Sequence, residues 1–144
     1  MNCKIILFLL TLLLYGCGKE NIVPNIKFDV LINLSDPEYA NKEVLDLGDV
    51  KDLNTGTRVG VGYSGVIVYR SARYVAFEKY CPHDQSNSCK ATVKKNETTK
   101  AVCNCCKTEF LLLTGEVVLG ESKYGLKEYK TELILPQNLL RIWN

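Results

Sequence analysis

Two cysteine-rich segments, each directly preceded by a strand-like run, constrain the fold of this chain most strongly. Residues 74–80 lead straight into the first segment, residues 81–89, and residues 98–102 lead into the second, residues 103–108. Together the segments contain five of the seven cysteines and the one histidine of the chain: Cys81, His83, Cys89, Cys103, Cys105 and Cys106. Functional residues often lie on loops that a rigid scaffold positions. Thiolates and imidazole favour zinc or iron–sulfur over calcium or magnesium.

The remainder of the chain also has the pattern of β-structure. Residues 26–32 alternate with a period near two, and a short strand is expected near residues 43–47. Paired β-branched and aromatic runs around short breaks predict three hairpins, at residues 65–80, 91–102 and 110–119. Residues 129–133 and 139–143 are typical of closing strands. Since no stretch shows sustained helical periodicity, the sequence predicts an all-β fold of small antiparallel sheets.

The N-terminus has the features of a secretory signal. Residues 5–15 form an apolar run that is too short to span a bilayer, for which about 20 residues are needed. The run ends in Leu14-Tyr15-Gly16-Cys17, which resembles the bacterial lipobox, where the cysteine becomes lipid-modified. We therefore expect a signal peptide at residues 1–16, a lipidated Cys17 with a tether to residue 25, and a β domain at 26–144. A lipid would tether the protein to a membrane of the bacterial cell envelope, at its periplasmic or outer-membrane face.

Composition narrows the possible functions. The formal net charge is only +2, and no basic stripe with interleaved aromatic residues is present, so we do not expect nucleic-acid binding. In an oxidising compartment the five cysteines of the β domain should form disulfides, bind metal, or both. Their odd number indicates that at least one acts as a ligand.

The two segments resemble the Rieske iron–sulfur family. That family has C-x-H in one loop and C-x-x-H in a second, and here Cys81-Pro82-His83 matches the first motif. Residues 103–106 align with the second motif, with Cys106 where the family has histidine. Phe110 and the Thr114-Gly115-Glu116 turn stand at the family's spacing after the second loop. The resemblance covers roughly residues 58–144 and implies the Rieske fold, with the two site loops at hairpin tips.

The resemblance also implies a ligand set. In the family, two cysteines hold one iron of a [2Fe–2S] cluster and two histidines hold the other. Carried over, the ligands are Cys81, His83, Cys103 and Cys106, and an extra cysteine in each loop forms a disulfide, here Cys89–Cys105. Lys107 replaces a glycine of the family, and Thr108 keeps the hydroxyl that serine supplies in many members. Phe110 stands where high-potential members often have tyrosine.

The sequence leaves several functions open. The first is single-electron transfer by a [2Fe–2S] cluster, which requires a redox partner protein. The second is a binding or structural role for a site closed by zinc or by disulfides, since the spacing of Cys103 and Cys106 also occurs in zinc knuckles. A catalyst in its own right is the least expected, because the chain has no length for a separate catalytic domain. Asp84 fits two roles equally, as an orienting partner of His83 or as a solvent-facing loop residue.

Overall fold

A computed structural model describes residues 22–144, which form twelve strands and no helix. Within these residues there is consequently no helix of the length and apolar character that a membrane span needs. The predicted signal peptide at residues 1–16, Cys17 and most of the tether lie outside the described residues.

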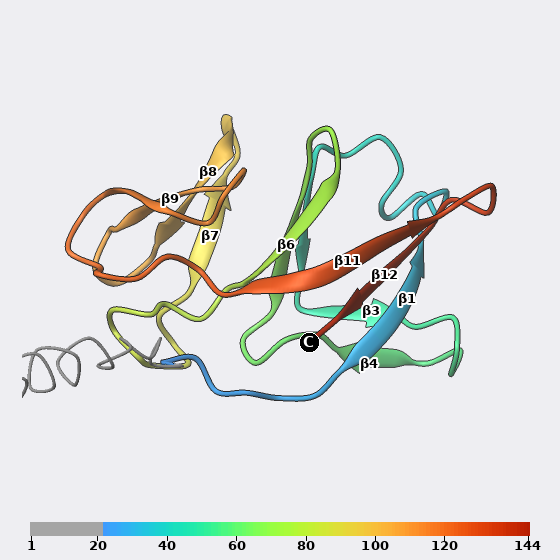
Figure 1. The fold of residues 1–144 in the computed structure, drawn as a ribbon, viewed down its shortest axis with the longest axis horizontal. Coiled ribbons are helices and arrows are strands. Elements are labelled where there is room, and N and C mark those ends of the chain that lie inside the picture. The colour runs from blue at the N-terminus through green and yellow to red at the C-terminus, as the bar shows by residue number, and fades with distance from the viewer. Residues whose placement is uncertain (1–21) are drawn as a thin grey trace, which may run out of the picture.

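The strands form three antiparallel sheets. In Figure 1, β7, β8 and β9 of the four-stranded sheet lie to the left of β6, and β11, β12 and β1 of the six-stranded sheet lie to its right. The six-stranded sheet has the order β1-β12-β11-β6-β5-β2 and the four-stranded sheet the order β10-β9-β8-β7; β3 and β4 form a separate ribbon. The strand bounds are β1 Asp29–Asn33, β2 Val44–Leu47, β3 Asp49–Lys51, β4 Arg58–Gly60, β5 Val66–Arg70, β6 Tyr74–Glu78, β7 Ala91–Lys94, β8 Glu97–Cys103, β9 Glu109–Leu111, β10 Val117–Leu119, β11 Glu128–Ile134 and β12 Leu139–Trp143.

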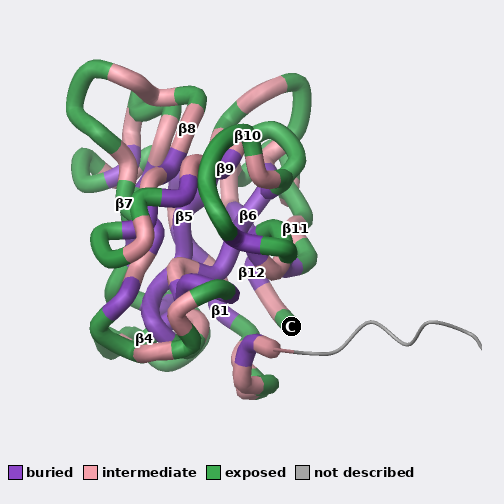
Figure 2. Tube along the Cα trace, turned by 90° about the vertical axis from the view of Figure 1, so that its left-hand side faces the viewer, coloured by how far each residue is buried: buried purple, intermediate pink, exposed green. Residues whose placement is uncertain are grey.

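The β5–β6 hairpin separates two hydrophobic cores. Successive side chains of a strand point to opposite faces, so Val66 and Val68 enter one core whereas Ile67 enters the other. The same division holds in β6, where Ala76 and Phe77 lie in different cores. Because both of its faces are covered, this hairpin has a nearly continuous apolar sequence. It forms the buried centre of the trace in Figure 2. The second core includes Cys81, Cys89 and Cys103 and thus extends to the two cysteine-rich loops.

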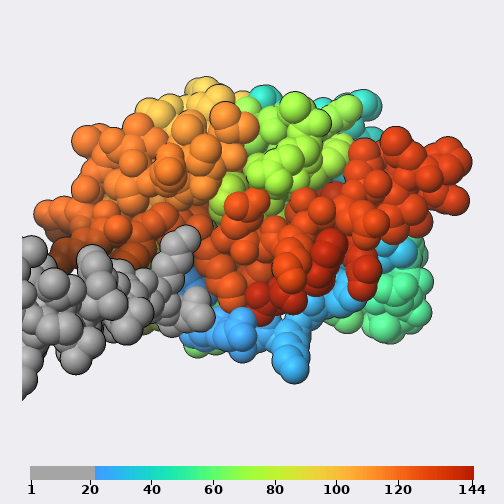
Figure 3. Space-filling model, in the orientation of Figure 1, coloured from blue at the N-terminus to red at the C-terminus, as the bar shows by residue number. Residues whose placement is uncertain are grey.

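Residues 23–25, which precede β1, pack against the C-terminal part of the domain. Val23 is buried, and the Asn25 side-chain oxygen accepts hydrogen bonds from Lys127 Nζ (3.1 Å) and Asn144 Nδ2 (2.6 Å). β1 then pairs with β12 along its whole length, and the blue and red segments lie side by side in Figure 3. Among the described residues, packing against the domain therefore starts as early as Val23.

The predicted hairpins are confirmed as β5–β6, β7–β8 and β9–β10, and the closing strands as β11–β12. The turn before β10 requires glycine, since Gly115 has φ of 75° and an added Cβ would lie 2.5 Å from the Phe77 ring. The β3–β4 ribbon was not predicted. Its strands have three residues each and no long apolar run, so periodicity carries little signal there.

Glu78, the last residue of β6, is a fully buried carboxylate that joins three parts of the domain. It accepts hydrogen bonds from the backbone N–H groups of Tyr63 (2.6 Å), Ser64 (2.8 Å) and Tyr80 (3.0 Å), and from the Tyr129 hydroxyl (2.6 Å). These donors come from the loop before β5, the start of the first cysteine-rich loop, and β11. Glu78 therefore fixes where the first site loop leaves the sheet.

Glu78→Gln should lower the free energy of unfolding by about 3 kcal/mol, because the amide keeps one acceptor, loses the charge and turns an N–H₂ group toward buried donors. Denaturant unfolding followed by circular dichroism measures this loss. Glu128→Gln removes an exposed carboxylate 3.6 Å from Arg73 and should cost less than about 1 kcal/mol. Equal losses in the two variants would contradict the role given to Glu78.

Candidate metal centre

The first site loop leaves β6 and returns to β7 as an extended hairpin. An isolated antiparallel bridge joins Tyr80 to Lys90, and the Cys81 N–H donates to the Cys89 carbonyl (3.0 Å). The residues between these pairs form the tip of the hairpin. Strand pairing therefore sets the positions of Cys81 and Cys89 at the base of the loop.

The second site loop is the tip of the β8–β9 hairpin. Cys103 is the last residue of β8, and its N–H donates to the Thr108 carbonyl (2.9 Å) on the far side of the loop. The three residues after Cys103 form a tight turn, which closes when the Lys107 N–H donates to the Cys103 carbonyl (3.2 Å). Cys103 is thus held at a strand end, and Cys106 lies in the turn.

The two loops are joined by a covalent bond and by an asparagine. A disulfide connects Cys89 to Cys105, the pair implied by the family resemblance. Beside it the Asn104 side chain accepts from the Lys90 N–H (2.7 Å) and donates to the Ser88 carbonyl (3.0 Å). The role of Asn104 was not predicted, since an asparagine in a loop usually serves its own turn.

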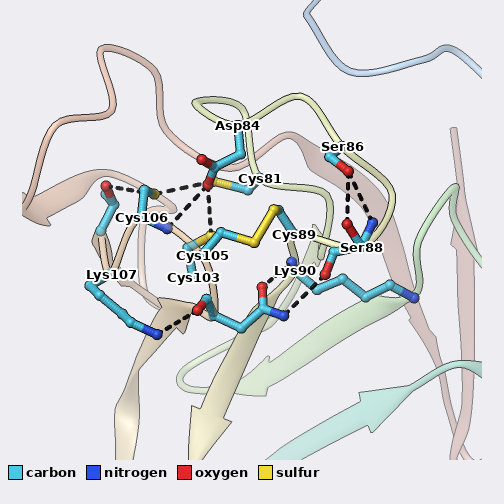
Figure 4. The surroundings of a disulfide bond; sticks show 12 residues. Cys81, Asp84, Ser86, Ser88, Cys89, Lys90, Cys103, Cys105, Cys106 and Lys107 are labelled. Atoms are coloured by element: carbon cyan, nitrogen blue, oxygen red, sulfur yellow. Dashed lines mark hydrogen bonds between the residues drawn. A yellow bond between two sulfur atoms is a disulfide. The ribbon is translucent and has the colours of Figure 1, made fainter.

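Three thiols and one carboxylate converge between the loops, as Figure 4 shows. The Sγ atoms of Cys81, Cys103 and Cys106 and a carboxylate oxygen of Asp84 all lie within 4.8 Å of one another. Cys81 and Cys103 are buried and Cys106 is half-buried, with 3.7 Å between the sulfurs of Cys81 and Cys106. The structure thus brings together three of the four residues that the sequence predicted as ligands.

Asp84 takes neither of the two roles that the sequence left open for it. Its Oδ2 accepts hydrogen bonds from the Cys103 thiol (3.2 Å) and from the Cys106 N–H (3.2 Å). Burial alone would raise the pKa of Asp84, but the hydrogen bonds from the three thiols and the Cys106 N–H outweigh it and lower the pKa below its usual value. The carboxylate is therefore ionised among the thiols.

The pKa values of the two buried thiols shift in the opposite direction. Burial raises the pKa of Cys81 well above its usual value, and it also raises the pKa of Cys103. Both thiols are therefore protonated near neutral pH in the absence of a cation. Because thiolates are the form that binds metal, a metal ion would have to displace these protons.

His83 lies outside this group. It is adjacent to Asp84 in sequence, yet its side chain is exposed and its Nε2 lies 3.9 Å from Glu121 Oε2. Glu121 belongs to the segment after β10 and is itself largely exposed.

The segment after β10 packs against the second loop around Thr108. The Thr108 hydroxyl lies 3.2 Å from the Cys106 sulfur and accepts a hydrogen bond from the Ser122 N–H (3.3 Å). Gly120 passes so close that an added Cβ would lie 2.6 Å from the Thr108 Cα, which explains the glycine at this position. Thr108 is fully buried, so its hydroxyl can serve only the groups around the site.

Lys107 has a left-handed backbone conformation. Its φ is 61°, in the region that glycine enters without cost. Its Nζ donates to the Asn104 carbonyl within the same loop. A lysine thus stands at a position whose backbone conformation favours glycine.

One comparison with known proteins identifies a family. The model of the Rieske [2Fe–2S] domain matches residues 43–130, more than half of the chain, and the match includes both site loops. No curated protein matches the chain.

The domain family implies an iron–sulfur cluster, and the donor geometry tests whether these residues fit one. A tetrahedral metal with bonds of about 2.3 Å to sulfur separates two of its sulfur ligands by about 3.8 Å. The sulfurs of Cys81 and Cys106 are 3.7 Å apart, a thiol–thiol contact whose length also matches the separation of two ligands on one metal. In the family alignment these two residues would bind different irons, and His83 would join Cys106 on the second iron. The donors therefore fit a single ion and do not fit a two-iron cluster held by that ligand set.

Cys89→Ala should free the Cys105 thiol and lower the free energy of unfolding by about 3 kcal/mol, as expected for a disulfide with 16 residues of sequence separation. Alkylation followed by peptide mass spectrometry identifies the new thiol. A Cys89→Ala/Cys105→Ala double variant should lose the same stability without gaining the reactive thiol. Failure of Cys105 to react in the single variant would contradict the pairing.

Proposed function

Since the chain belongs to the Rieske [2Fe–2S] domain family, we propose that its two site loops hold a metal centre and that the protein acts in the bacterial cell envelope, anchored to a membrane by a lipid on Cys17. One observation carries the metal centre: the three thiols and the carboxylate lie within 4.8 Å of one another. Soft sulfur ligands in this number select zinc or iron. A thiolate-bound metal is thus the function that the site geometry supports best.

Such a centre would have a structural consequence. Two of its thiols, Cys103 and Cys106, come from the second loop, and Cys81 comes from the first. A bound ion would therefore connect the loops in parallel with the Cys89–Cys105 disulfide. Metal ligands that are brought together only in the folded chain add binding free energy to folding.

Family membership favours a second candidate, a [2Fe–2S] cluster that transfers single electrons to and from a redox partner protein. Its expected ligands are Cys81, His83, Cys103 and Cys106. In this arrangement His83 would turn away from Glu121, and Cys106 would move away from Cys81. A third thiolate in place of an imidazole would add negative charge beside the iron and lower the reduction potential.

Metal analysis of the full chain, extracted from its native membrane in mild detergent, separates these candidates. We expect one metal ion per chain and a loss of thermal stability when a chelator removes it. Two irons per chain, with acid-labile sulfide and a reddish-brown colour, would favour the electron-transfer candidate instead. A metal-free protein with its thiols oxidised would contradict both.

The lipid anchor is tested by Cys17→Ser, which removes the modification site. The protein should move from the membrane fraction to the soluble fraction after cell breakage, because no lipid chain then holds it at the bilayer. Cys3→Ser is the matched control, since Cys3 lies in the predicted signal peptide and its replacement should leave the protein in the membrane fraction. Retention of the Cys17→Ser protein on membranes would contradict the anchor.

A further inference from the structure

The two site loops contain the same turn, which places a fourth donor beside the three thiols. In the first loop the Gln85 N–H donates to the Cys81 carbonyl (3.1 Å), and in the second the Lys107 N–H donates to the Cys103 carbonyl (3.2 Å). Each turn thus starts at a cysteine and closes four residues later. The closing residue is left-handed in both, with φ of 49° at Gln85 and 61° at Lys107.

Within these matched turns, the third residue after the first cysteine faces the site. In the second turn this residue is Cys106, and in the first it is Asp84. Asp84 Oδ2 lies 3.2 Å from Cys103 Sγ, so the first turn extends its donor across to the second. Figure 4 shows dashed lines from the carboxylate to Cys103 and Cys106 of the second turn.

The residue two positions after each first cysteine supplies no free donor to this group. In the second turn it is Cys105, whose sulfur lies within 4.8 Å of an Asp84 oxygen but is bonded to Cys89. In the first turn it is His83, which is exposed beside Glu121 and lies outside the group. The aspartate, and not the histidine, is therefore the donor that the first turn brings to the thiols.

We propose that Cys81, Asp84, Cys103 and Cys106 bind one divalent thiophilic metal ion, zinc in preference, in a tetrahedral site of three sulfurs and one oxygen, and that His83 is not a ligand. This inference rests on the metal centre proposed above and specifies its ligands and its nuclearity. Cys81 and Cys106 already lie at the separation of two ligands on one tetrahedral ion.

Hydrogen bonding favours the same ligand set. The Cys106 N–H holds Asp84 Oδ2 in place, and the Thr108 hydroxyl lies beside the Cys106 sulfur, so both ligands have orienting partners. With four protein donors the site has no open position, which is typical of structural zinc and not of catalytic zinc.

Cobalt(II) and zinc binding to the full chain tests the proposal, with Asp84→Asn as the variant and Glu121→Gln as the matched carboxylate control. Wild type should bind one cobalt, with ligand-field bands of tetrahedral geometry and thiolate charge-transfer bands. Asp84→Asn should weaken zinc affinity by at least roughly 10- to 100-fold, which is the loss expected when a residue that only orients a ligand is removed. Glu121→Gln and His83→Gln should leave the affinity and the cobalt spectrum unchanged.

X-ray absorption at the zinc edge of the wild-type protein gives a second readout, which needs no variant to fold. It should show three sulfur neighbours and one lighter neighbour. Unchanged affinity in Asp84→Asn, a loss of affinity in His83→Gln, or two irons per chain would overturn the proposed ligand set while leaving a metal centre in place. A wild type that binds neither cobalt nor zinc nor iron would overturn the metal centre itself.

Discussion

The two cysteine-rich site loops are held face to face, and this contact determines which chemical groups meet in the domain. The first loop connects the six-stranded sheet to the four-stranded sheet, and the second lies within the four-stranded sheet. The Cys89–Cys105 disulfide and the Asn104 hydrogen bonds join them. Because these links lie beside Cys81, Cys103 and Cys106, the disulfide and the thiol group are parts of one arrangement. Without the links, the strand pairing at the base of each loop would hold the thiols near one another.

Much of this fold could be predicted from sequence. The hairpins follow from alternating and β-branched runs with clear breaks, and Gly115 marks a turn in which only glycine fits. The β3–β4 ribbon escaped prediction because its strands are short and half polar. Glu78 could not be recognised either, since a glutamate at a strand end is usually exposed. Its burial depends on donors from Tyr63 and Tyr129, which come from distant parts of the chain.

The residue types of the site could be predicted from the sequence, but which side chains face the thiols could be predicted only in part. Cys81, Cys103 and Cys106 stand at strand ends and turn positions that the family resemblance locates. Whether His83 or Asp84 faces the thiols depends on the turn that closes at Gln85, and a left-handed glutamine has no sequence signal comparable to glycine. One signal was present in retrospect: Asp84 follows Cys81 at the same spacing at which Cys106 follows Cys103. The spacing within the turn, rather than the residue type, thus indicates which side chain meets the thiols in the structure.

The packing of residues 22–25 limits how far the domain can lie from the proposed lipid anchor. Val23 is buried, and it lines one hollow together with Ile22 and Pro82, the residue after Cys81. The proposed lipid-bearing Cys17 lies five positions before Ile22, and a fully extended chain of that length spans at most about 18 Å. With the lipid on Cys17 that we propose, the first site loop would stay within a short distance of the bilayer. A protein that contacts this loop would then meet it close to the membrane surface.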